Sequence, residues 1–133
     1  MARGGFFAVD SLTSVHVLVV DDDPVFRDVL LSLLRYCGAL VTAVATAEEA
    51  LLAMNQVKPD ALVITIGGGD RAAAAALPAN VRKRKPEDGG HIPIVAVLRA
   101  GQDQAPESVN AHLAEPLNPW ELCRVISTLL ATG

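Results

Sequence analysis

Short apolar runs alternate along the chain with longer amphipathic segments. Residues 15–20, 61–66 and 92–98 are continuous runs rich in β-branched side chains, a pattern typical of strands covered on both faces. Residues 40–44 and 112–114 predict two shorter strands. Strands that alternate with helices favour right-handed crossovers, so the pattern predicts a doubly wound α/β fold with one parallel sheet.

Helix start signals support this alternation. Asp23 followed by Pro24 predicts an N-cap with proline at the first helical position. The helix carries one broad apolar stripe and is expected to stop at Gly38; the stripe comprises Val25, Phe26, Val29, Leu30, Leu33 and Leu34. Thr46 and Glu49 form a capping box that opens a second helix through Met54.

The remaining segments are less regular. An alanine-rich helix is predicted after the third strand, capped by Asp70 and kinked or broken at Pro78. Residues 100–111 are polar and interrupted by Pro106, so the fourth helix is expected to be shortened or irregular. Asn118, Pro119 and Glu121 repeat the capping pattern and open a last helix through Leu130. We predict an N-terminal tail at 1–14 and one domain at 15–131.

Composition narrows the class of protein. The 133 residues are 51% hydrophobic and carry a formal net charge of −4, which fits a globular domain and argues against nucleic acid as a direct partner. The basic run at 82–85 is interpreted as a solvated helix end, with a partner-binding patch as the alternative. Cys37 and Cys123 match no metal or redox spacing and are predicted to be buried thiols. No stretch is long enough for a membrane span, and a cytoplasmic protein is expected.

The candidate chemistry lies at the carboxyl ends of the strands, where sites form in open parallel sheets. The first strand is followed by Asp21, Asp22 and Asp23, of which Asp23 is assigned to capping. Two adjacent carboxylates repel each other unless a cation lies between them, and such oxygen ligands suit Mg²⁺.

Four segments make the chain resemble the receiver domain of two-component response regulators: "VLVVDDDPVFRDVLLSLL", "KPDALVI", "HIPIVAV" and "HLAEPLNPWELCRVISTLL". The resemblance covers about 15–130 and implies a flavodoxin-like (βα)5 fold with strand order 2-1-3-4-5. It also implies phosphoryl transfer from a histidine kinase to an aspartate that closes the third strand. That transfer needs Mg²⁺ on the acidic pair, a Ser or Thr ending the fourth strand, and a Lys before a proline after the fifth.

The resemblance retains the acidic pair as Asp21 and Asp22, with Asp22 as the direct metal ligand. The other positions that it implies have changed. Thr65 stands at the acceptor position, Leu98 at the hydroxyl position and Glu115 at the lysine position. His112 stands at the switch position of the fifth strand, and Gly69 replaces the proline usual after the acceptor. We expect this vestigial phosphorylation pocket to lack ordinary phosphoryl transfer, because the nucleophilic aspartate is missing and a carboxylate stands where a cation is needed.

The acidic residues that remain require a counter-charge. Arg99 follows Leu98 and is expected to plug the pocket by pairing with Asp22 or Glu115. Two alternatives remain open: Glu115 joins the acidic pair as a metal ligand, or Glu115 and Arg99 are both solvated.

The leading hypothesis is a non-enzymatic pseudo-receiver that acts by protein–protein contact and needs no cofactor, with at most weak Mg²⁺ binding. Its expected partner is a histidine kinase, a response regulator or another signalling protein. A homodimer through the face of the fourth helix, fifth strand and fifth helix is a further expectation, with Trp120 as the interface anchor. Two alternatives are a phosphoacceptor at Asp21, Asp70 or Thr65, and a receiver that binds a small ligand.

Overall fold

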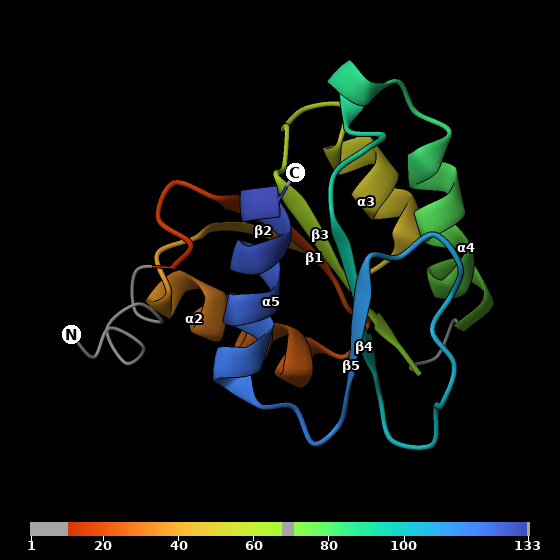
Figure 1. Cartoon of the computed structure of the whole chain (residues 1–133). Coiled ribbons are helices and arrows are strands. Elements are labelled where there is room, and N and C mark those ends of the chain that lie inside the picture. Colours follow the sequence, from red (N-terminus) through yellow and green to blue (C-terminus); the bar gives the residue numbers. More distant parts are fainter. Residues whose placement is uncertain (1–10, 68–70, 133) are drawn as a thin grey trace.

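A five-stranded parallel sheet forms the centre of the protein. The computed structural model describes residues 11–67 and 71–132. The strands are β1 (His16–Val20), β2 (Leu40–Val44), β3 (Ala61–Ile66), β4 (Ile94–Leu98) and β5 (Ala111–Ala114), and their order in the sheet is β2-β1-β3-β4-β5. The helices in the described residues are α2 (Pro24–Tyr36), α3 (Ala47–Ala53), α4 (Arg71–Arg82) and α5 (Pro119–Thr132), with a short 3₁₀ turn at Pro86–Asp88. This flavodoxin-like architecture confirms the predicted fold class (Figure 1).

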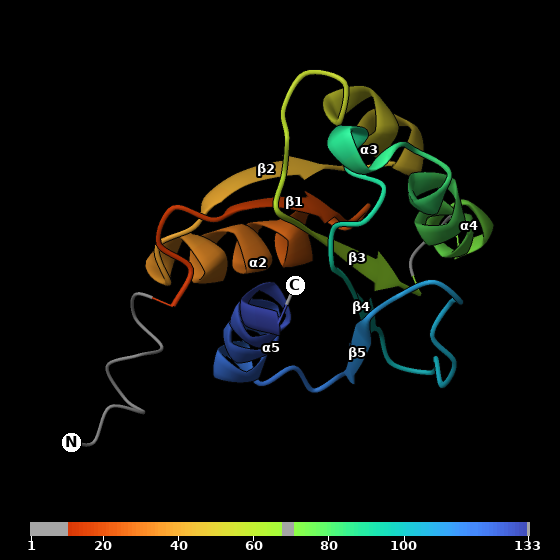
Figure 2. The same ribbon diagram turned by 45° about the horizontal axis from the view of Figure 1, so that its top comes forward.

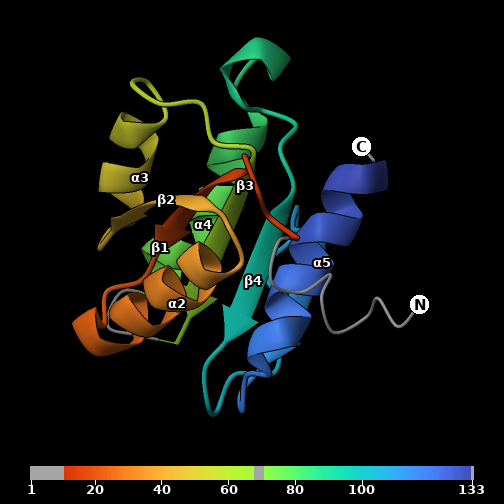
Figure 3. The same ribbon diagram turned by 90° about the vertical axis from the view of Figure 1, so that its left-hand side faces the viewer.

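The helices cover both faces of the sheet. Figure 2 shows α2 and α5 on one face and α3 and α4 on the other, and Figure 3 likewise separates α5 from α3. Each face has its own apolar cluster because successive side chains of a strand point to opposite faces. Val17 and Val19 of β1 belong to the cluster under α2 and α5, whereas Leu18 and Val20 pack with residues of α3 and α4. No helix in the described ranges 11–67 and 71–132 has the length and hydropathy needed to cross a bilayer.

Helix α2 begins as predicted, with the Asp23 side chain accepting hydrogen bonds from the backbone N–H groups of Val25 and Phe26. Its predicted apolar stripe is too broad. Val25 and Val29 are 73% and 53% exposed. The turn of 100° per residue places them beside the buried face and not within it.

The predicted tail at 1–14 includes residues that pack against the domain. Leu12 is fully buried in the cluster under α2 and α5, and its backbone N–H donates to the carbonyl of Cys37 at 3.0 Å. The expectation of a loose tail is therefore wrong for residues 11–14, since burial of one large apolar side chain holds this turn to the end of α2.

Helix α4 continues through Pro78, which contradicts the predicted break. Leu77 and Val81 are fully buried on either side of the proline, so packing against the sheet outweighs the hydrogen bond that Pro78 cannot donate. The predicted N-cap, Asp70, lies outside the described residues.

The connection from β4 to β5, residues 99–110, contains no helix, in agreement with the predicted irregular segment.

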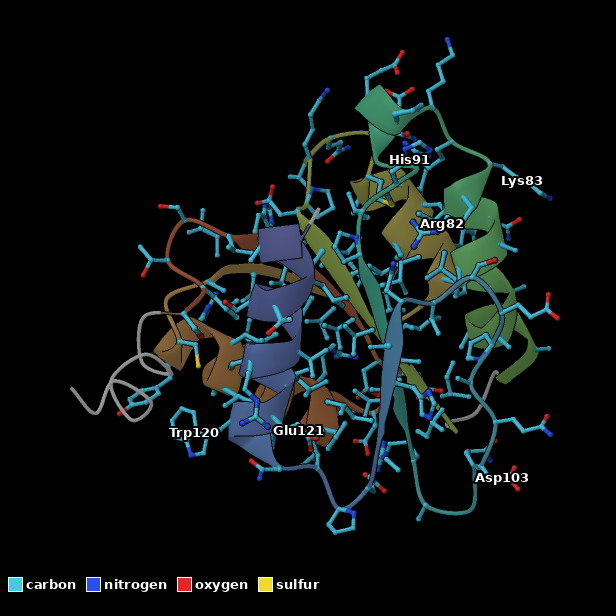
Figure 4. The ribbon with its side chains drawn as sticks, in the orientation of Figure 1. Arg82, Lys83, His91, Asp103, Trp120 and Glu121 are labelled. Atoms are coloured by element: carbon cyan, nitrogen blue, oxygen red, sulfur yellow. The ribbon has the colours of Figure 1, made fainter. Side chains whose placement is uncertain are left out.

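Two arginines of the basic run at 82–85 donate hydrogen bonds to neighbouring loops. Arg82 donates to the carbonyls of Gly90 and Ile92 and to Asn110 Oδ1 at 2.7–2.9 Å. Arg84 donates to the carbonyl of Asp88. Figure 4 shows Lys83 directed outward, so the run is partly structural and only partly solvated.

Candidate functional site

The register of the sheet brings the predicted site residues to one edge. Val20 pairs with Ile64, so Asp21 and Thr65 follow at the same level on neighbouring strands. Leu98 pairs with Ile66 and with Ala114, which places Arg99 and Glu115 side by side beyond β4 and β5.

Asp21 is the buried carboxylate of this edge, with 2% of its surface exposed. Its Oδ1 accepts the backbone N–H of Asp23 at 2.9 Å, whereas its Oδ2 has no hydrogen-bond partner among the described residues. Burial raises the pKa of Asp21, because desolvation disfavours the ionised form more than its hydrogen bonds favour it. The neighbouring Thr65 is also buried, and its hydroxyl donates to the carbonyl of Val20 at 3.3 Å.

A cavity of about 330 Å³ opens beside Asp21, between the ends of β1 and β3 and the helices α3 and α4. Its polar lining comes from Asp21, Asp22, Thr46, Glu48 and Thr65. Its apolar lining comes from Val20, Ala45, Ala47, Ala73 and Ala74. The ionisable groups among these lining residues are all acidic.

Arg99 occupies the other half of the edge. Its Nε donates to Glu115 Oε2 at 2.7 Å, and its Nη2 lies 3.5 Å from Asp23 Oδ2. The guanidinium carbon lies 4.4 Å from the ring centroid of Phe26, which adds a cation–π contact. Glu115 accepts a second hydrogen bond from the backbone N–H of Ala100 at 2.9 Å. The expected pairing of Arg99 with Glu115 is therefore present.

Two further residues make this arrangement possible, and the sequence analysis missed both roles. Gly67 has a φ of +128°, and a Cβ on it would lie 2.7 Å from the Cβ of Arg99, so glycine permits the side chain to cross there. Asp23 caps α2 and also contacts Arg99. The hydrogen bond from the Phe26 backbone, with help from Arg99, lowers the pKa of Asp23.

A metal ion has few ligands available at this edge. Among residues 11–67 and 71–132, no group of three or more His, Cys, Asp or Glu side chains is arranged to hold one. Asp22 is exposed and Asp21 has one unpartnered oxygen, which fits weak binding of a hydrated cation. Glu115 does not fit the alternative role of metal ligand, because both of its oxygens are engaged by Arg99 and Ala100.

The remaining predicted positions lie around the edge. Leu98 is buried in the cluster under α3 and α4, and His112 is exposed on β5. Trp120 is 46% exposed at the first turn of α5 (Figure 4). Its ring centroid lies 5.8 Å from that of Tyr36, which is also exposed. The sequence analysis did not single out Tyr36, because nothing in its local pattern places it against α5.

Comparisons with the sequences of known proteins do not identify a family for this chain. No family model matches the chain. An uncharacterized 14.6 kDa protein from the sodA1 3′ region of Leptolyngbya boryana is 28% identical over 123 residues, which cover 89% of this chain and 92% of that protein.

Comparisons with solved structures agree with the fold described above. A candidate response regulator from Chloroflexus aurantiacus is 29% identical with a TM-score of 0.78, and the match covers 88% of this chain and 98% of that one. The receiver domain of the sensor histidine kinase PA1611 from Pseudomonas aeruginosa, solved with a magnesium ion in its active-site cleft, is 24% identical with a TM-score of 0.76 over the same shares. At this lower identity the second comparison concerns the fold alone.

Proposed function

We propose that this chain, which has the fold of response-regulator receiver domains, is a pseudo-receiver that signals by protein contact without phosphorylation. A receiver fold implies a role in two-component signalling. The observation that carries the finer proposal is the ion pair of 2.7 Å between Arg99 and Glu115. It places a carboxylate where the resemblance implies an ammonium group, and it engages the guanidinium of Arg99.

The chemistry of the edge supports this proposal. Phosphoryl transfer to a carboxylate requires an ionised nucleophile and cations that neutralise the phosphoryl oxygens. Thr65 has a hydroxyl at this position, Leu98 has no hydrogen-bond donor, and Glu115 adds negative charge. Loss of one such electrostatic contact typically costs about 3–4 kcal/mol of transition-state stabilisation, so we propose no enzymatic activity.

Non-standard phosphoacceptors receive less support. Thr65 and Asp21 are both buried, and the Thr65 hydroxyl already donates to a backbone carbonyl. Asp70, the third residue considered, lies outside the described residues.

Incubation with acetyl phosphate and Mg²⁺, followed by intact-mass measurement, tests the proposal. We expect no gain of about 80 Da, the mass of one phosphoryl group, while a receiver with a complete site gains it under the same conditions. A labile adduct on this chain would contradict the proposal, and digestion would identify its position.

The exposed ring pair of Tyr36 and Trp120 is the proposed contact surface, because large aromatic side chains anchor many interfaces. The pair joins α2 and α5, and so differs from the predicted face of the fourth helix, fifth strand and fifth helix, because residues 99–110 between β4 and β5 form no helix. The proposed partner is a histidine kinase, a response regulator, another signalling protein or a second copy of the chain. The proposal retains the cytoplasmic location and the absence of nucleic-acid contact predicted from the sequence.

A matched pair of variants tests this surface. We expect Trp120→Ala to reduce capture of a purified candidate partner, or self-association by sedimentation, at least tenfold. Leu52→Ala on α3 removes another exposed apolar side chain from the other face of the molecule and should have no effect. Equal loss in both variants would contradict the assignment.

The cavity beside Asp21 favours a second candidate function, binding of a small cationic ligand. The unpartnered Oδ2 and the acidic lining are the observations that support it. Thermal unfolding in the presence of small amines and of Mg²⁺ tests this idea. A saturable shift in the wild type that Asp21→Asn abolishes would support it.

A further inference from the structure

Two cysteines that are far apart in the sequence meet in the core. Cys37 is the C-cap residue of α2, and Cys123 lies in the second turn of α5. Their sequence separation is 86 residues, yet their Sγ atoms lie 2.7 Å apart. Both are free thiols and both are fully buried. Sequence spacing alone gave no indication of this pair, since only the packing of α5 against α2 creates it.

We propose that Cys37 and Cys123 are a redox-active dithiol that closes to an intramolecular disulfide when the protein meets a hydroperoxide. Protein disulfides have S–S bonds of about 2.05 Å. The two sulfurs therefore need to approach by only a fraction of an ångström, and the carrying helices already lie side by side (Figure 2).

The reaction proceeds in two steps with hydrogen peroxide as the oxidant. The Cys37 thiolate attacks one peroxide oxygen, the O–O bond breaks, and a sulfenic acid and one water form after proton transfer. Cys123 then attacks the Cys37 sulfur, the S–O bond breaks, and a second water leaves. Overall, the two thiols lose two protons and two electrons, and one hydrogen peroxide is reduced to two waters.

Cys37 is the attacking thiol in this scheme for two reasons. Burial raises the pKa of Cys123, because desolvation disfavours the Cys123 thiolate. Cys37 also lies at a helix end, where the peptide chain opens more readily than within a helix.

Access to the pair is controlled by the turn at 11–14. Leu12 packs in the same apolar cluster as both cysteines, and its N–H donates to the carbonyl of Cys37 at 3.0 Å. Displacement of this short turn exposes the end of α2 without separating any strands of the sheet. Oxidation is therefore expected to be slow in the closed state and faster whenever the turn opens.

The cross-link also acts on the protein surface. Tyr36 immediately precedes Cys37, and Trp120 lies one helical turn before Cys123, so a disulfide would fix the two backbones that carry the ring pair. This inference does not depend on whether that ring pair binds a partner.

The test uses the full chain, first reduced with dithiothreitol and then exposed to hydrogen peroxide in the folded state. Samples are denatured and alkylated, and their masses are measured. In the wild type we expect the number of alkylated thiols to fall from two to zero on oxidation. Without alkylation, the oxidised chain should be about 2 Da lighter than the reduced chain and form no covalent dimer, and dithiothreitol should restore both thiols. Peptide mapping should recover the segments containing Cys37 and Cys123 as one linked species.

Three variants sharpen the test. Cys37→Ser and Cys123→Ser should each abolish the intramolecular loss of 2 Da. Leu12→Ala should accelerate disulfide formation at least fivefold, and Leu52→Ala, which removes an exposed leucine from α3 on the other face of the sheet, should leave the rate unchanged. Trp120, the single tryptophan, gives a second readout through its fluorescence.

Persistence of two alkylatable thiols in both the wild type and Leu12→Ala would overturn the proposal, provided that a peptide dithiol is oxidised in the same solution. Oxygen addition at the cysteines without loss of both thiols, or disulfides between chains, would overturn it as well.

Discussion

At the scale of single residues, Arg99 determines what the carboxyl edge of the sheet can do. Its charge contacts Glu115 and Asp23 and lies over the Phe26 ring, with its side chain about three-quarters shielded from solvent. Charge-assisted hydrogen bonds in such surroundings are stronger than those of exposed ion pairs, whose median contribution is about 0–1 kcal/mol. Arg99 therefore supplies a positive charge that holds Glu115 and Asp23 together at the carboxyl edge of the sheet.

Arg99→Ala and Glu115→Ala should each destabilise the protein by about 1–3 kcal/mol, because each leaves a shielded charge without its partner. The double variant should cost clearly less than the sum of the two single variants. Urea unfolding measures all four proteins, and Lys83→Ala removes an exposed positive charge as the control. Strict additivity of the two single effects would show that the pair is not coupled.

Asp21→Asn should stabilise the protein at neutral pH by about 1 kcal/mol, because the ionised carboxylate is buried with an unpartnered oxygen. Since the folded-state pKa of Asp21 is raised, the cost of its ionisation is full above that pKa and shrinks as the pH falls. The advantage of the variant should vanish below the ordinary value of 3.8. Urea unfolding at both pH values, with a chelator present, checks this; a gain independent of pH would contradict it.

Sequence patterns predicted part of the site. The convergence of Asp21, Thr65 and Glu115 and the Arg99–Glu115 pairing followed from the resemblance and from counting charges. The role of Gly67 and the stacking of Phe26 could not be predicted in this way. Both depend on where the Arg99 side chain crosses the loop, which local spacing does not determine.

At the scale of elements, local signals predicted helix caps correctly and missed what depends on long-range packing. The caps at Asp23 and Thr46 were predicted correctly because a cap depends on side chains within three residues of it. A break at Pro78 and a tail that includes Leu12 were predicted wrongly, because long-range burial decides both cases. The stripe on α2 was drawn too wide because apolar composition alone does not define how much of a helix the sheet covers.

Thr46→Ala should destabilise the protein by about 1 kcal/mol, because it removes an N-cap. The Thr46 hydroxyl accepts a hydrogen bond from the backbone N–H of Glu49 at 3.0 Å, and the Glu49 carboxylate accepts one from the backbone N–H of Thr46. Thr46→Ser retains the oxygen and should recover most of the loss. Thermal unfolding of both variants measures the difference. Equal destabilisation by alanine and serine would indicate that the methyl group matters and the cap does not.

At the scale of the whole molecule, the sheet separates the two apolar clusters, and Leu98 at the carboxyl end of β4 has no hydrogen-bonding group for a phosphoryl oxygen. Leu98 is fixed in one cluster, and His112 is exposed at the edge strand. Leu98 has no hydrogen-bond donor with which a phosphoryl group could draw β4 inward. The molecule is expected to keep one arrangement on this side.

Addition of Mg²⁺ with the phosphoryl analogue beryllofluoride should leave amide hydrogen exchange of β4, β5 and α5 unchanged, because nothing at the edge couples a bound anion to these elements. A receiver with a complete site, measured in parallel, should show altered exchange. Slower exchange of β5 in the present chain would reveal a coupling that the edge residues do not explain.

The ion pair between Arg99 and Glu115 also constrains which substitutions this edge of the sheet tolerates. Glu115→Lys alone would place two cations in contact next to the Phe26 ring, so a lysine at this position requires removal of Arg99 as well. Arginine directly after the fourth strand, together with glutamate before the proline, is thus a two-position signature to look for in other chains of this fold.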